Sequence, residues 1–341
     1  MRILAVTNIY PTPHRPALGT FIEQQVTSLR HHGVEVDVFF LDRARLGMRS
    51  YGGLGRQVRA RLTASQPDIV HVMYGGIMAD VVTRVITDRP TVVSFCGSDL
   101  YGEHLSGYLR KVIAGYGVLA SHRAAQRATG VIVKSKLLRE KLPRTLDQSK
   151  VRIIPNGVDL DQFQPLDQQR CQQRLGWERQ HLHVLFPANS GDPVKRPQLA
   201  RAAVERVAQC SFPVEFHELR GVPHQTVRYW LNASDVVLLT SRHEGSPNIV
   251  KEALACNIPI VSVTVGDVPE RIAGISGCYL ADPEPNDLAA KLQLVFTGSR
   301  RVAGRPRMQD LSLDTVAARL CNFYDDILQR HQRPTGFSHT A

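Results

Sequence analysis

The chain has 341 residues, of which 43% are hydrophobic and 21% charged, and its formal net charge is +11. This composition excludes a fibrous or low-complexity chain, and the length favours two globular domains. The charge is concentrated in residues 1–165, which hold 22 Lys and Arg against 13 Asp and Glu. We therefore expect the first half to meet an anionic partner, such as a membrane surface, a lipid diphosphate or a nucleic acid. The alternative is a basic composition without a dedicated partner.

The six cysteines include no C-x2-C pair, and several lie in apolar runs. This spacing favours reduced thiols in a cytosolic compartment and predicts no zinc site. The first residues enter a strand-like segment directly, so we expect no signal peptide. No apolar run approaches the roughly 18 residues of a membrane span, so any membrane contact should be peripheral.

Short apolar runs alternate with helix-like segments in the first half. Phe21 to His32 has helical spacing and is closed by Gly33. The apolar runs lack polar alternation, which is typical of buried parallel strands. The predicted strands cover residues 2–7, 34–41, 68–73, 91–96, 130–135 and 151–155. This alternation predicts a doubly wound parallel sheet.

The same pattern restarts in the second half and predicts a second α/β domain. Its predicted strands cover residues 183–188, 213–219, 235–241 and 258–264. Thr315 to Gln332 reads as an amphipathic helix. The predicted organisation is a first domain over residues 1–165, a second over 166–314, a terminal helix over 315–332 and a disordered tail over 333–341.

The segment EGSPNIVKE places two carboxylates, Glu244 and Glu252, eight positions apart. Ser246 suits an N-cap and Pro247 suits the first helical position, and Asn257 suits the end of that helix. A helix N-terminus presents unpaired N–H groups and a partial positive charge, which suits a phosphate. One carboxylate near a sugar and one near a ribose, with a diphosphate between them, is what a sugar-nucleotide enzyme needs.

Extended to EGSPNIVKEALACNIPIVSVTVGDVPERI, this segment resembles the E-x7-E block of the retaining glycosyltransferases of family four. Three further blocks of that family have counterparts in the expected order, namely MRILAVTNIYPTP with GTFIEQQVTSLRHHGVEVDVF, VVSFCGSDL and IPNGVDLDQF. The resemblance covers roughly residues 1–295. It implies an α/β GT-B fold, in which two Rossmann-like domains with parallel sheets face each other across a cleft and a final helix returns to the first domain.

The resemblance also implies the roles of individual residues. Glu252 matches the glutamate that binds the ribose, Glu244 the glutamate near the donor sugar, and Lys195 the lysine that contacts the diphosphate. Catalysis is expected from Glu244, Lys195 and Asp99, with the cation Lys195 stabilising the developing diphosphate charge and Glu244 positioning the donor sugar. Donor binding is expected from Gly19, Lys195, Arg196, Gly245, Ser246, Pro247, Asn248, Ile249 and Glu252.

Two positions depart from the family pattern. Cys96 stands where the block before Asp99 usually has His, and a thiol cannot replace imidazole as a donor at neutral pH. Either catalysis does not depend on that His, or His104 acts in its place. Ser190 stands where the family usually has Arg, and Arg196 is the candidate replacement. A catalytically inactive relative that only binds a nucleotide sugar therefore stays open as an alternative.

No group of His, Cys and Asp residues has convincing ligand spacing, so we expect no obligatory metal and no cofactor. Asp159 and Asp161 form a D-x-D pair, which binds a metal in another glycosyltransferase fold. Here the pair lies in the segment between the domains, where capping or a hinge role is expected instead.

The predicted function is retaining, metal-independent transfer of a sugar from a nucleotide-sugar donor to a glycan or lipid-linked acceptor in surface polysaccharide or glycolipid synthesis. The basic stretches Arg43 to Arg61 and Arg110 to Lys141 are expected to face that acceptor or an anionic membrane surface, unless they form a solvated face. The expected location is the cytoplasm, with peripheral membrane contact.

A sugar-nucleotide epimerase or hydrolase of the same fold is the nearest rival to this function. A nicotinamide dehydrogenase is disfavoured because the first turn lacks G-x-G-x-x-G. No nucleic-acid-binding motif is visible, so we expect no nucleic-acid partner.

Overall fold

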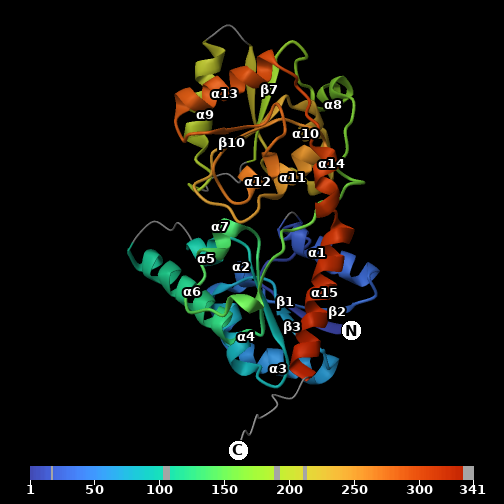
Figure 1. Ribbon diagram of the computed structural model, residues 1–341. Helices are drawn as coiled ribbons and strands as arrows, with labels where there is room; N and C mark the ends of the chain where they lie inside the picture. The colour runs from blue at the N-terminus through green and yellow to red at the C-terminus, as the bar shows by residue number, and fades with distance from the viewer. Residues whose placement is uncertain (17, 103–107, 188–192, 210–212, 333–341) are drawn as a thin grey trace, which may run out of the picture.

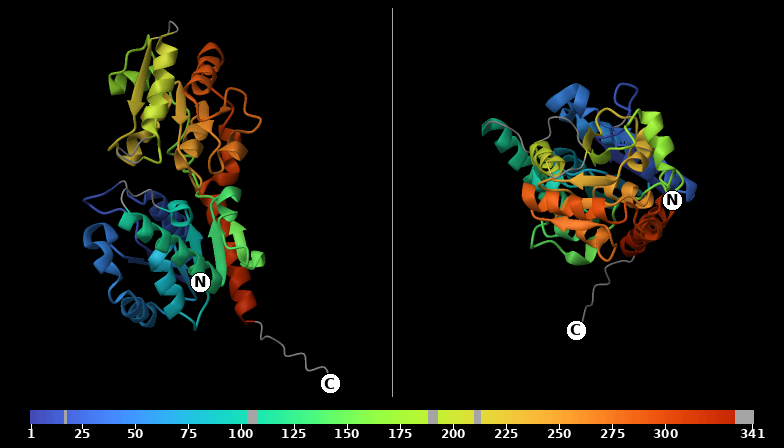
Figure 2. Two further views of the ribbon diagram at one scale, coloured as in Figure 1. Left: turned by 90° about the vertical axis from the view of Figure 1, so that its left-hand side faces the viewer. Right: turned by 90° about the horizontal axis from the view of Figure 1, so that it is seen from above.

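The computed structural model describes residues 1–16, 18–102, 108–187, 193–209 and 213–332. Two α/β domains lie end to end, each built on its own parallel sheet (Figure 1). The side view in Figure 2 shows that the last long helix runs from one domain along the other. The predicted fold class, with two parallel α/β units, is confirmed.

The N-terminal domain is built on a six-stranded sheet in the order β2-β1-β3-β4-β5-β6, and every pair of neighbours is parallel. Apolar residues of β1 have no exposed surface, as expected where helices cover both faces of a sheet. The strands are β1 (Arg2–Thr7), β2 (Glu35–Phe40), β3 (Ile69–Val72), β4 (Thr91–Phe95), β5 (Gly130–Val133) and β6 (Val151–Ile153).

Seven α-helices and two short 3-10 helices connect these strands within the described residues. They are α1 (Thr20–His31), α2 (Arg43–Leu46), η1 (Gly47–Tyr51), α3 (Leu54–Ser65), α4 (Gly76–Val85), α5 (Ser98–Tyr101), α6 (Tyr108–Arg127), α7 (Lys136–Arg139) and η2 (Gln148–Lys150).

The C-terminal domain is built on a five-stranded parallel sheet in the order β11-β10-β9-β7-β8. Its strands are β7 (Leu182–Phe186), β8 (Val214–Glu218), β9 (Val236–Leu239), β10 (Ile260–Val263) and β11 (Tyr279–Ala281). Its helices are α8 (Gln168–Leu175), α9 (Pro197–Ala208), η3 (His224–Thr226), α10 (Val227–Ala233), α11 (Asn248–Ala255), α12 (Val268–Ile272), α13 (Pro285–Thr297), α14 (Arg305–Met308) and η4 (Gln309–Leu311).

The last helix, α15 (Leu313–Gln332), packs on the N-terminal domain beside α1. Its buried Tyr324 bonds through the hydroxyl to Nδ1 of His71 on β3 at 2.7 Å. Nε2 of that ring lies 2.7 Å from Oγ of Ser94 on β4. Gly130 on β5 lets the helix approach, because an added Cβ would lie 2.5 Å from Cδ1 of Ile327. Helix α15 therefore fastens onto the first domain.

Each of the ten predicted strands has a counterpart in the structure, and the predicted terminal helix lies within α15. The predicted start of α11 is wrong by one residue. Pro247, with φ −66° and ψ 120°, is the N-cap in place of Ser246. The Ser246 hydroxyl bonds to Asp267 and Lys251 and not to a helix N–H, which explains the shift. The predicted tail over 333–341 lies outside the described residues.

Among the described residues, no helix combines the length and the apolar character that crossing a bilayer requires.

Candidate functional site

A pocket lies between the two domains, beyond the carboxyl ends of strands from both sheets. We call it the cleft pocket. Such a position is where open α/β sheets bind their ligands. The N-terminal domain contributes Phe21, Cys96 and Asn156 to its lining, and the C-terminal domain contributes Pro187, Lys195, Leu239 and the six residues Glu244, Gly245, Ser246, Pro247, Asn248 and Ile249. The segment that the sequence singled out therefore forms much of the wall on the C-terminal side.

Buried polar contacts hold this segment in place. The Ser246 hydroxyl donates to Oδ2 of Asp267 at 2.9 Å and accepts from Nζ of Lys251 at 3.1 Å. The same ammonium group donates to the carbonyl oxygen of Asn156 in the opposite domain at 2.8 Å. Burial lowers the pKa of Lys251 to about 8, although the charge of Asp267 opposes that shift. The start of α11 is thus fixed both within its own domain and across the cleft.

Lys195 and Glu244 form an ion pair in the wall of the cleft pocket. Lys195 comes from the loop before α9, and Glu244 from the loop after β9. The Lys195 side chain is 25% exposed and that of Glu244 is 16% exposed, so a ligand in the pocket can reach them. The pair places one cation and one carboxylate side by side near the beginning of α11. A cation beside phosphate oxygens makes strong charge-assisted bonds, and the carboxylate can accept from sugar hydroxyls.

Glu252 lies on α11, behind the pocket wall, and is 8% exposed. Its Oε1 lies 3.1 Å from Nε2 of His224 on η3. Burial lowers the pKa of His224, but the hydrogen bond and charge of Glu252 outweigh burial and raise it overall. Phe163 meets the same imidazole edge-on at 5.4 Å between ring centroids. His224 carried no signal in the sequence, because its loop has no ligand or catalytic spacing.

The two domains touch through glycines. A Cβ added to Gly245 would lie 1.9 Å from the carbonyl oxygen of Cys96. A Cβ added to Gly97, whose φ is 150°, would lie 3.2 Å from the Gly245 nitrogen. Only glycine allows backbones this close together. Gly245 therefore has a second role beside its predicted donor contact, which is to let the domains close on each other. Tyr101 and His243 stack across the same boundary at 4.8 Å.

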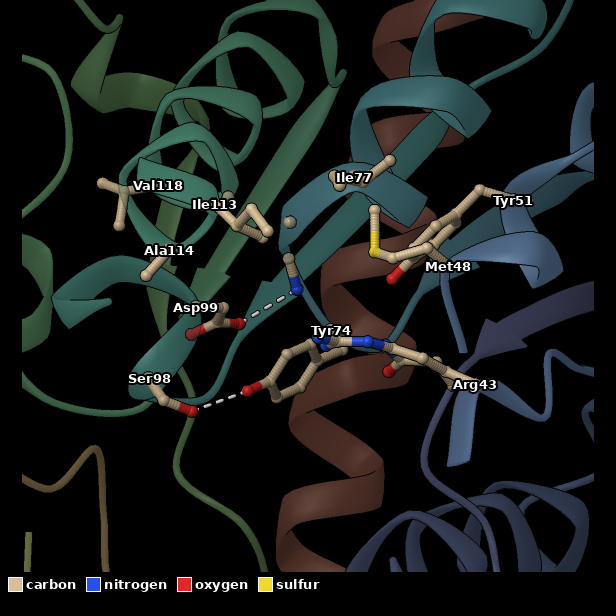
Figure 3. Close-up of a pocket in the computed structure, with 14 residues that line it drawn as sticks. Arg43, Met48, Tyr51, Tyr74, Ile77, Ser98, Asp99, Ile113, Ala114 and Val118 are labelled. Carbon is tan, nitrogen blue, oxygen red and sulfur yellow. Dashed lines mark hydrogen bonds between the residues drawn. The ribbon is translucent and has the colours of Figure 1, made fainter. Parts of the chain in front are cut away.

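Asp99 organises the turn that carries Cys96. Its carboxylate accepts from the backbone N–H groups of Cys96 at 3.0 Å and Gly97 at 2.8 Å. It also accepts from the N–H of Gly75 at 2.9 Å, which is the bond of Asp99 drawn in Figure 3. Burial raises the pKa of Asp99, while these backbone bonds oppose the shift. Burial likewise raises the pKa of the Cys96 thiol to about 12, so it stays protonated at neutral pH. Both carboxylate oxygens of Asp99 therefore hold the backbone of this turn in place. The catalytic role of Asp99 stays a prediction.

A second pocket, the N-terminal pocket, lies wholly in the first domain (Figure 3). The Tyr74 and Ser98 hydroxyls lie 2.6 Å apart in its wall. Met48 and Ile113 face it from opposite sides, and both have large exposed surfaces. Four other exposed apolar side chains of this domain, Leu46, Val112, Tyr116 and Leu119, are not among the residues that line the pocket. This pocket combines polar groups inside with an apolar rim.

Arg196 and Gly19 are not among the residues that line the cleft pocket. Nε of Arg196 donates to the Thr240 carbonyl at 2.5 Å, and its Nη2 to the Ser241 carbonyl at 3.3 Å, so this guanidinium ties α9 to the end of β9. Gly19 is the N-cap of α1 with φ 76°, and an added Cβ would lie 2.8 Å from the Ile9 backbone. Their donor contacts stay predictions.

Asp159 caps its own turn, because its Oδ1 accepts from the N–H groups of Asp161 at 3.0 Å and Gln162 at 2.8 Å. This matches the expected capping role. His104 and Ser190 lie outside the described residues.

Two family models match the chain in the order of its two domains. Residues 18–162 match Glycosyltransferase Family 4, and residues 183–297 match Glycosyl transferases group 1. The chain belongs to the family 4, group 1 glycosyltransferases. It is therefore an enzyme of the transferase class, and the rival epimerase or hydrolase is not favoured.

Relatives and solved structures agree with this family. The teichuronic acid biosynthesis glycosyltransferase TuaC of Bacillus subtilis is 25% identical, over 93% of this chain and 94% of its own length. A D-inositol 3-phosphate glycosyltransferase of Catenulispora acidiphila is 26% identical over 46% of this chain and 45% of its own.

Among solved structures, sucrose-phosphate synthase from Thermosynechococcus elongatus has a TM-score of 0.77 at 17% identity, covering 97% of this chain and all of that one. Anabaena HepE, solved in complex with UDP-glucose, has a TM-score of 0.69 at 17% identity, covering 96% of this chain and all of that one. At these identities the likeness shows the GT-B fold alone.

Proposed function

We propose that this glycosyltransferase is retaining and metal-independent, and that it moves a sugar from a nucleotide-sugar donor to a glycan or lipid-linked acceptor. The observation that carries the proposal is the Lys195–Glu244 pair beside the start of α11, in the pocket between the domains. A cation, a carboxylate and a helix N-terminus are together the groups that a sugar joined to a diphosphate requires.

The donor diphosphate binds Lys195, which exchanges its bond to Glu244 for bonds to phosphate oxygens. As the bond from the anomeric carbon to the diphosphate breaks, negative charge grows on the leaving oxygen, and the ammonium group stabilises it. The freed Glu244 then accepts hydrogen bonds from the donor sugar, and Glu252 accepts them from the ribose. The buried Oδ1 of Asn156 has no hydrogen-bond partner among the described residues, and it supplies a further acceptor for a donor hydroxyl.

The acceptor enters through the N-terminal pocket. Asn8 lines that pocket, and its buried Oδ1 has no hydrogen-bond partner among the described residues, so it can accept from an acceptor hydroxyl. The exposed apolar side chains on α6 and around η1 suit an acyl or polyprenyl chain, and the exposed arginines Arg45 and Arg49 suit anionic headgroups. These features support a cytoplasmic enzyme at a membrane surface that builds a cell-surface polysaccharide or glycolipid.

The first donor to test is UDP-glucose, because a structural neighbour was solved with it. The protein, freed of metals with EDTA, is incubated with UDP-glucose and a short-chain polyprenyl diphosphate sugar, and the product is examined by proton NMR. The proposal predicts transfer in EDTA, with the donor's α-configuration kept in the product. A β-linked product would contradict retention, and activity that returns only with added Mg²⁺ or Mn²⁺ would contradict metal independence.

The protonated thiol of Cys96 stands where the family usually has imidazole, and replacing Cys96 with His tests whether sugar transfer depends on that difference. If the wild type transfers sugar at a rate similar to that of Cys96→His, catalysis does not depend on an imidazole at this position. A wild type without turnover, together with activity in Cys96→His, would contradict the proposed function.

A further inference from the structure

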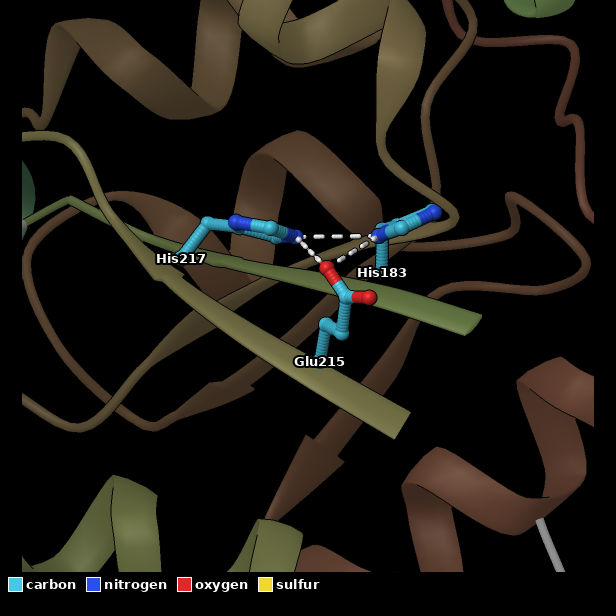
Figure 4. Close-up of side chains that lie close together, drawn as sticks. All are labelled: His183, Glu215 and His217. Atoms are coloured by element: carbon cyan, nitrogen blue, oxygen red, sulfur yellow. Dashed lines mark hydrogen bonds and ion pairs between the residues drawn. The ribbon is translucent and has the colours of Figure 1, made fainter. Parts of the chain in front are cut away.

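Two histidines and a glutamate meet at the edge of the second sheet that is formed by β8 (Figure 4). His183 lies on β7, and Glu215 and His217 lie on β8. The parallel register pairs His183 with Glu215. Because alternate residues of a strand share a face, His217 points to the same side as both. The spacing of these residues in the sequence did not indicate the cluster, since strand register brings together positions some 30 residues apart.

The three ligand atoms form a compact triangle. Nδ1 of His183 lies 2.9 Å from Nε2 of His217 and 3.7 Å from Oε2 of Glu215. Nε2 of His217 lies 3.4 Å from the same carboxylate oxygen. Ligands of a tetrahedral Zn²⁺ with bonds of about 2.0–2.1 Å are roughly 3.3 Å apart. The three edges bracket that separation, so a cation can bind all three atoms with little movement.

The hydrogen bonds around His183 direct its lone pair toward the triangle. Its Nε2 lies 2.9 Å from the carbonyl oxygen of Glu178, which can only accept, so Nε2 carries the proton. Nδ1 is therefore unprotonated and faces His217 and Glu215. An imidazole whose outer N–H donates to a backbone carbonyl is the usual arrangement of a metal-binding histidine. Without a metal, Nε2–H of His217 donates to His183. A bound cation takes the place of that proton, which moves to Nδ1 of His217.

The surroundings orient the ligands and leave a way in. His183 has no exposed surface, whereas the Glu215 side chain is 31% exposed. The other carboxylate oxygen, Oε1, bonds to Nδ1 of His181 at 2.5 Å, which holds Oε2 toward the histidines. The Trp177 ring stacks on His217 with centroids 3.6 Å apart. The three side chains can fill three of the four positions around a tetrahedral ion. Because Glu215 faces solvent, the fourth position is left for water.

We propose that His183, Glu215 and His217 form a binding site for a transition-metal dication with the preferences of Zn²⁺. Two imidazoles and a carboxylate suit Zn²⁺ over Mg²⁺ or Ca²⁺, which prefer oxygen ligands. The ion ties edge strand β8 to β7. None of the three residues lines the cleft pocket, so the site stabilises the domain and takes no part in sugar transfer.

Tryptophan fluorescence gives a direct test, because the two tryptophans of the chain both adjoin this cluster. Trp177 stacks on His217, and Trp230 meets Trp177 edge-on at 5.5 Å. The untagged protein is freed of metals and titrated with Co²⁺, whose unpaired electrons quench nearby indoles, and then with Zn²⁺ by calorimetry. Glu215→Gln keeps the shape of the side chain but removes a good ligand, and His217→Gln removes a second one. His14→Gln is the matched control at an exposed loop histidine.

The proposal predicts saturable binding of one ion per chain, quenching by Co²⁺, and a Zn²⁺-dependent rise in Tm. Both site variants should weaken binding at least tenfold, and His14→Gln should not. Glu215→Gln should also keep the sugar-transfer rate of the wild type. Absence of saturable binding would overturn the proposal. So would equal affinity in Glu215→Gln, His217→Gln and the wild type, which would mean binding by surface histidines.

Discussion

Lys195 and Glu244 neutralise each other across the cleft pocket before any donor arrives. The pair keeps the ammonium group in position, and a diphosphate with two negative charges competes well for it. At the scale of single residues, this pair and the Glu252–His224 pair are the two places where the side chains match the groups of a nucleotide sugar.

Lys195→Ala should reduce the rate of sugar transfer by at least tenfold. The leaving diphosphate loses the cation that stabilises its developing charge, and about 1.4 kcal/mol of lost stabilisation corresponds to one factor of ten. Initial rates at saturating donor measure this. Lys291→Ala on α13, at a lysine remote from the cleft pocket, is the control. Equal rates for Lys195→Ala and the control would place the diphosphate contact elsewhere.

Glu252→Gln should change the pH dependence of stability. Glu252 raises the pKa of His224 above its ordinary value, so the pair stabilises the fold fully below that value and loses this contribution as pH rises through the raised pKa. The difference in Tm between wild type and variant should therefore be largest near about pH 5.5 and shrink toward about pH 8.5, a range around the ordinary histidine pKa of roughly 6.5. Glu205→Gln at an exposed site of α9 is the control. A difference that does not vary with pH would refute the coupling.

At the scale of elements, α15 packs against the sheet of the first domain and fastens the last described residues to it. Tyr324→Phe leaves Nδ1 of the buried His71 without its partner. Burial lowers the pKa of His71 to about 3, so the ring stays neutral. It therefore cannot compensate for the lost hydrogen bond by taking up a proton. We expect a decrease of about 1–3 kcal/mol in the free energy of unfolding, measured in urea. Asp326→Asn on the exposed face of α15 should change it little.

The contact between the domains depends on the loop before α11. Gly245→Ala places a methyl group 1.9 Å from the Cys96 carbonyl oxygen, so the two domains must move apart. We expect a larger radius of gyration in small-angle X-ray scattering and a transfer rate at least tenfold lower. Gly115→Ala on α6 has open space around the new methyl and is the control. An unchanged radius together with an unchanged rate would show that the cleft does not need this contact.

The sequence predicted the elements well because buried parallel strands are continuous apolar runs, which are visible without a structure. β11 escaped prediction, since Tyr279–Ala281 is only three residues long and partly exposed. The sequence singled out residues that line the cleft pocket where they adjoin along the chain, as from Glu244 to Ile249. Contacts that depend on strand register or on the approach of the two domains could not be predicted from the sequence. The contact of His183 with His217 and that of Gly245 with Cys96 are examples, because each contact joins residues on separate elements.

At the scale of the whole molecule, the positive charge of the first half and a group of exposed apolar side chains lie on the same domain. Val112 is 54% exposed and Leu119 50% exposed, and helical spacing puts them on one face of α6 with Tyr116. A basic surface with a row of apolar side chains is typical of a protein that rests on an anionic membrane.

The enzyme should therefore bind vesicles that contain phosphatidylglycerol more tightly than vesicles of phosphatidylcholine alone, and salt should weaken that binding. The double variant Val112→Gln and Leu119→Gln should bind the anionic vesicles several-fold more weakly, because it loses apolar surface that enters the interface. Leu294→Gln, an exposed leucine of the C-terminal domain, is the control. Sedimentation with vesicles measures the bound fraction. Equal binding to both vesicle types would contradict an electrostatic membrane contact.

Calorimetric titration shows whether the cleft pocket binds a nucleotide without a metal. The wild type, Glu252→Ala and Glu205→Ala are each titrated with UDP, GDP and ADP in the presence of EDTA. We expect micromolar binding of one nucleotide by the wild type and by Glu205→Ala, and binding at least tenfold weaker by Glu252→Ala. Absence of binding by all three nucleotides, or equal affinity in Glu252→Ala and the wild type, would contradict this expectation.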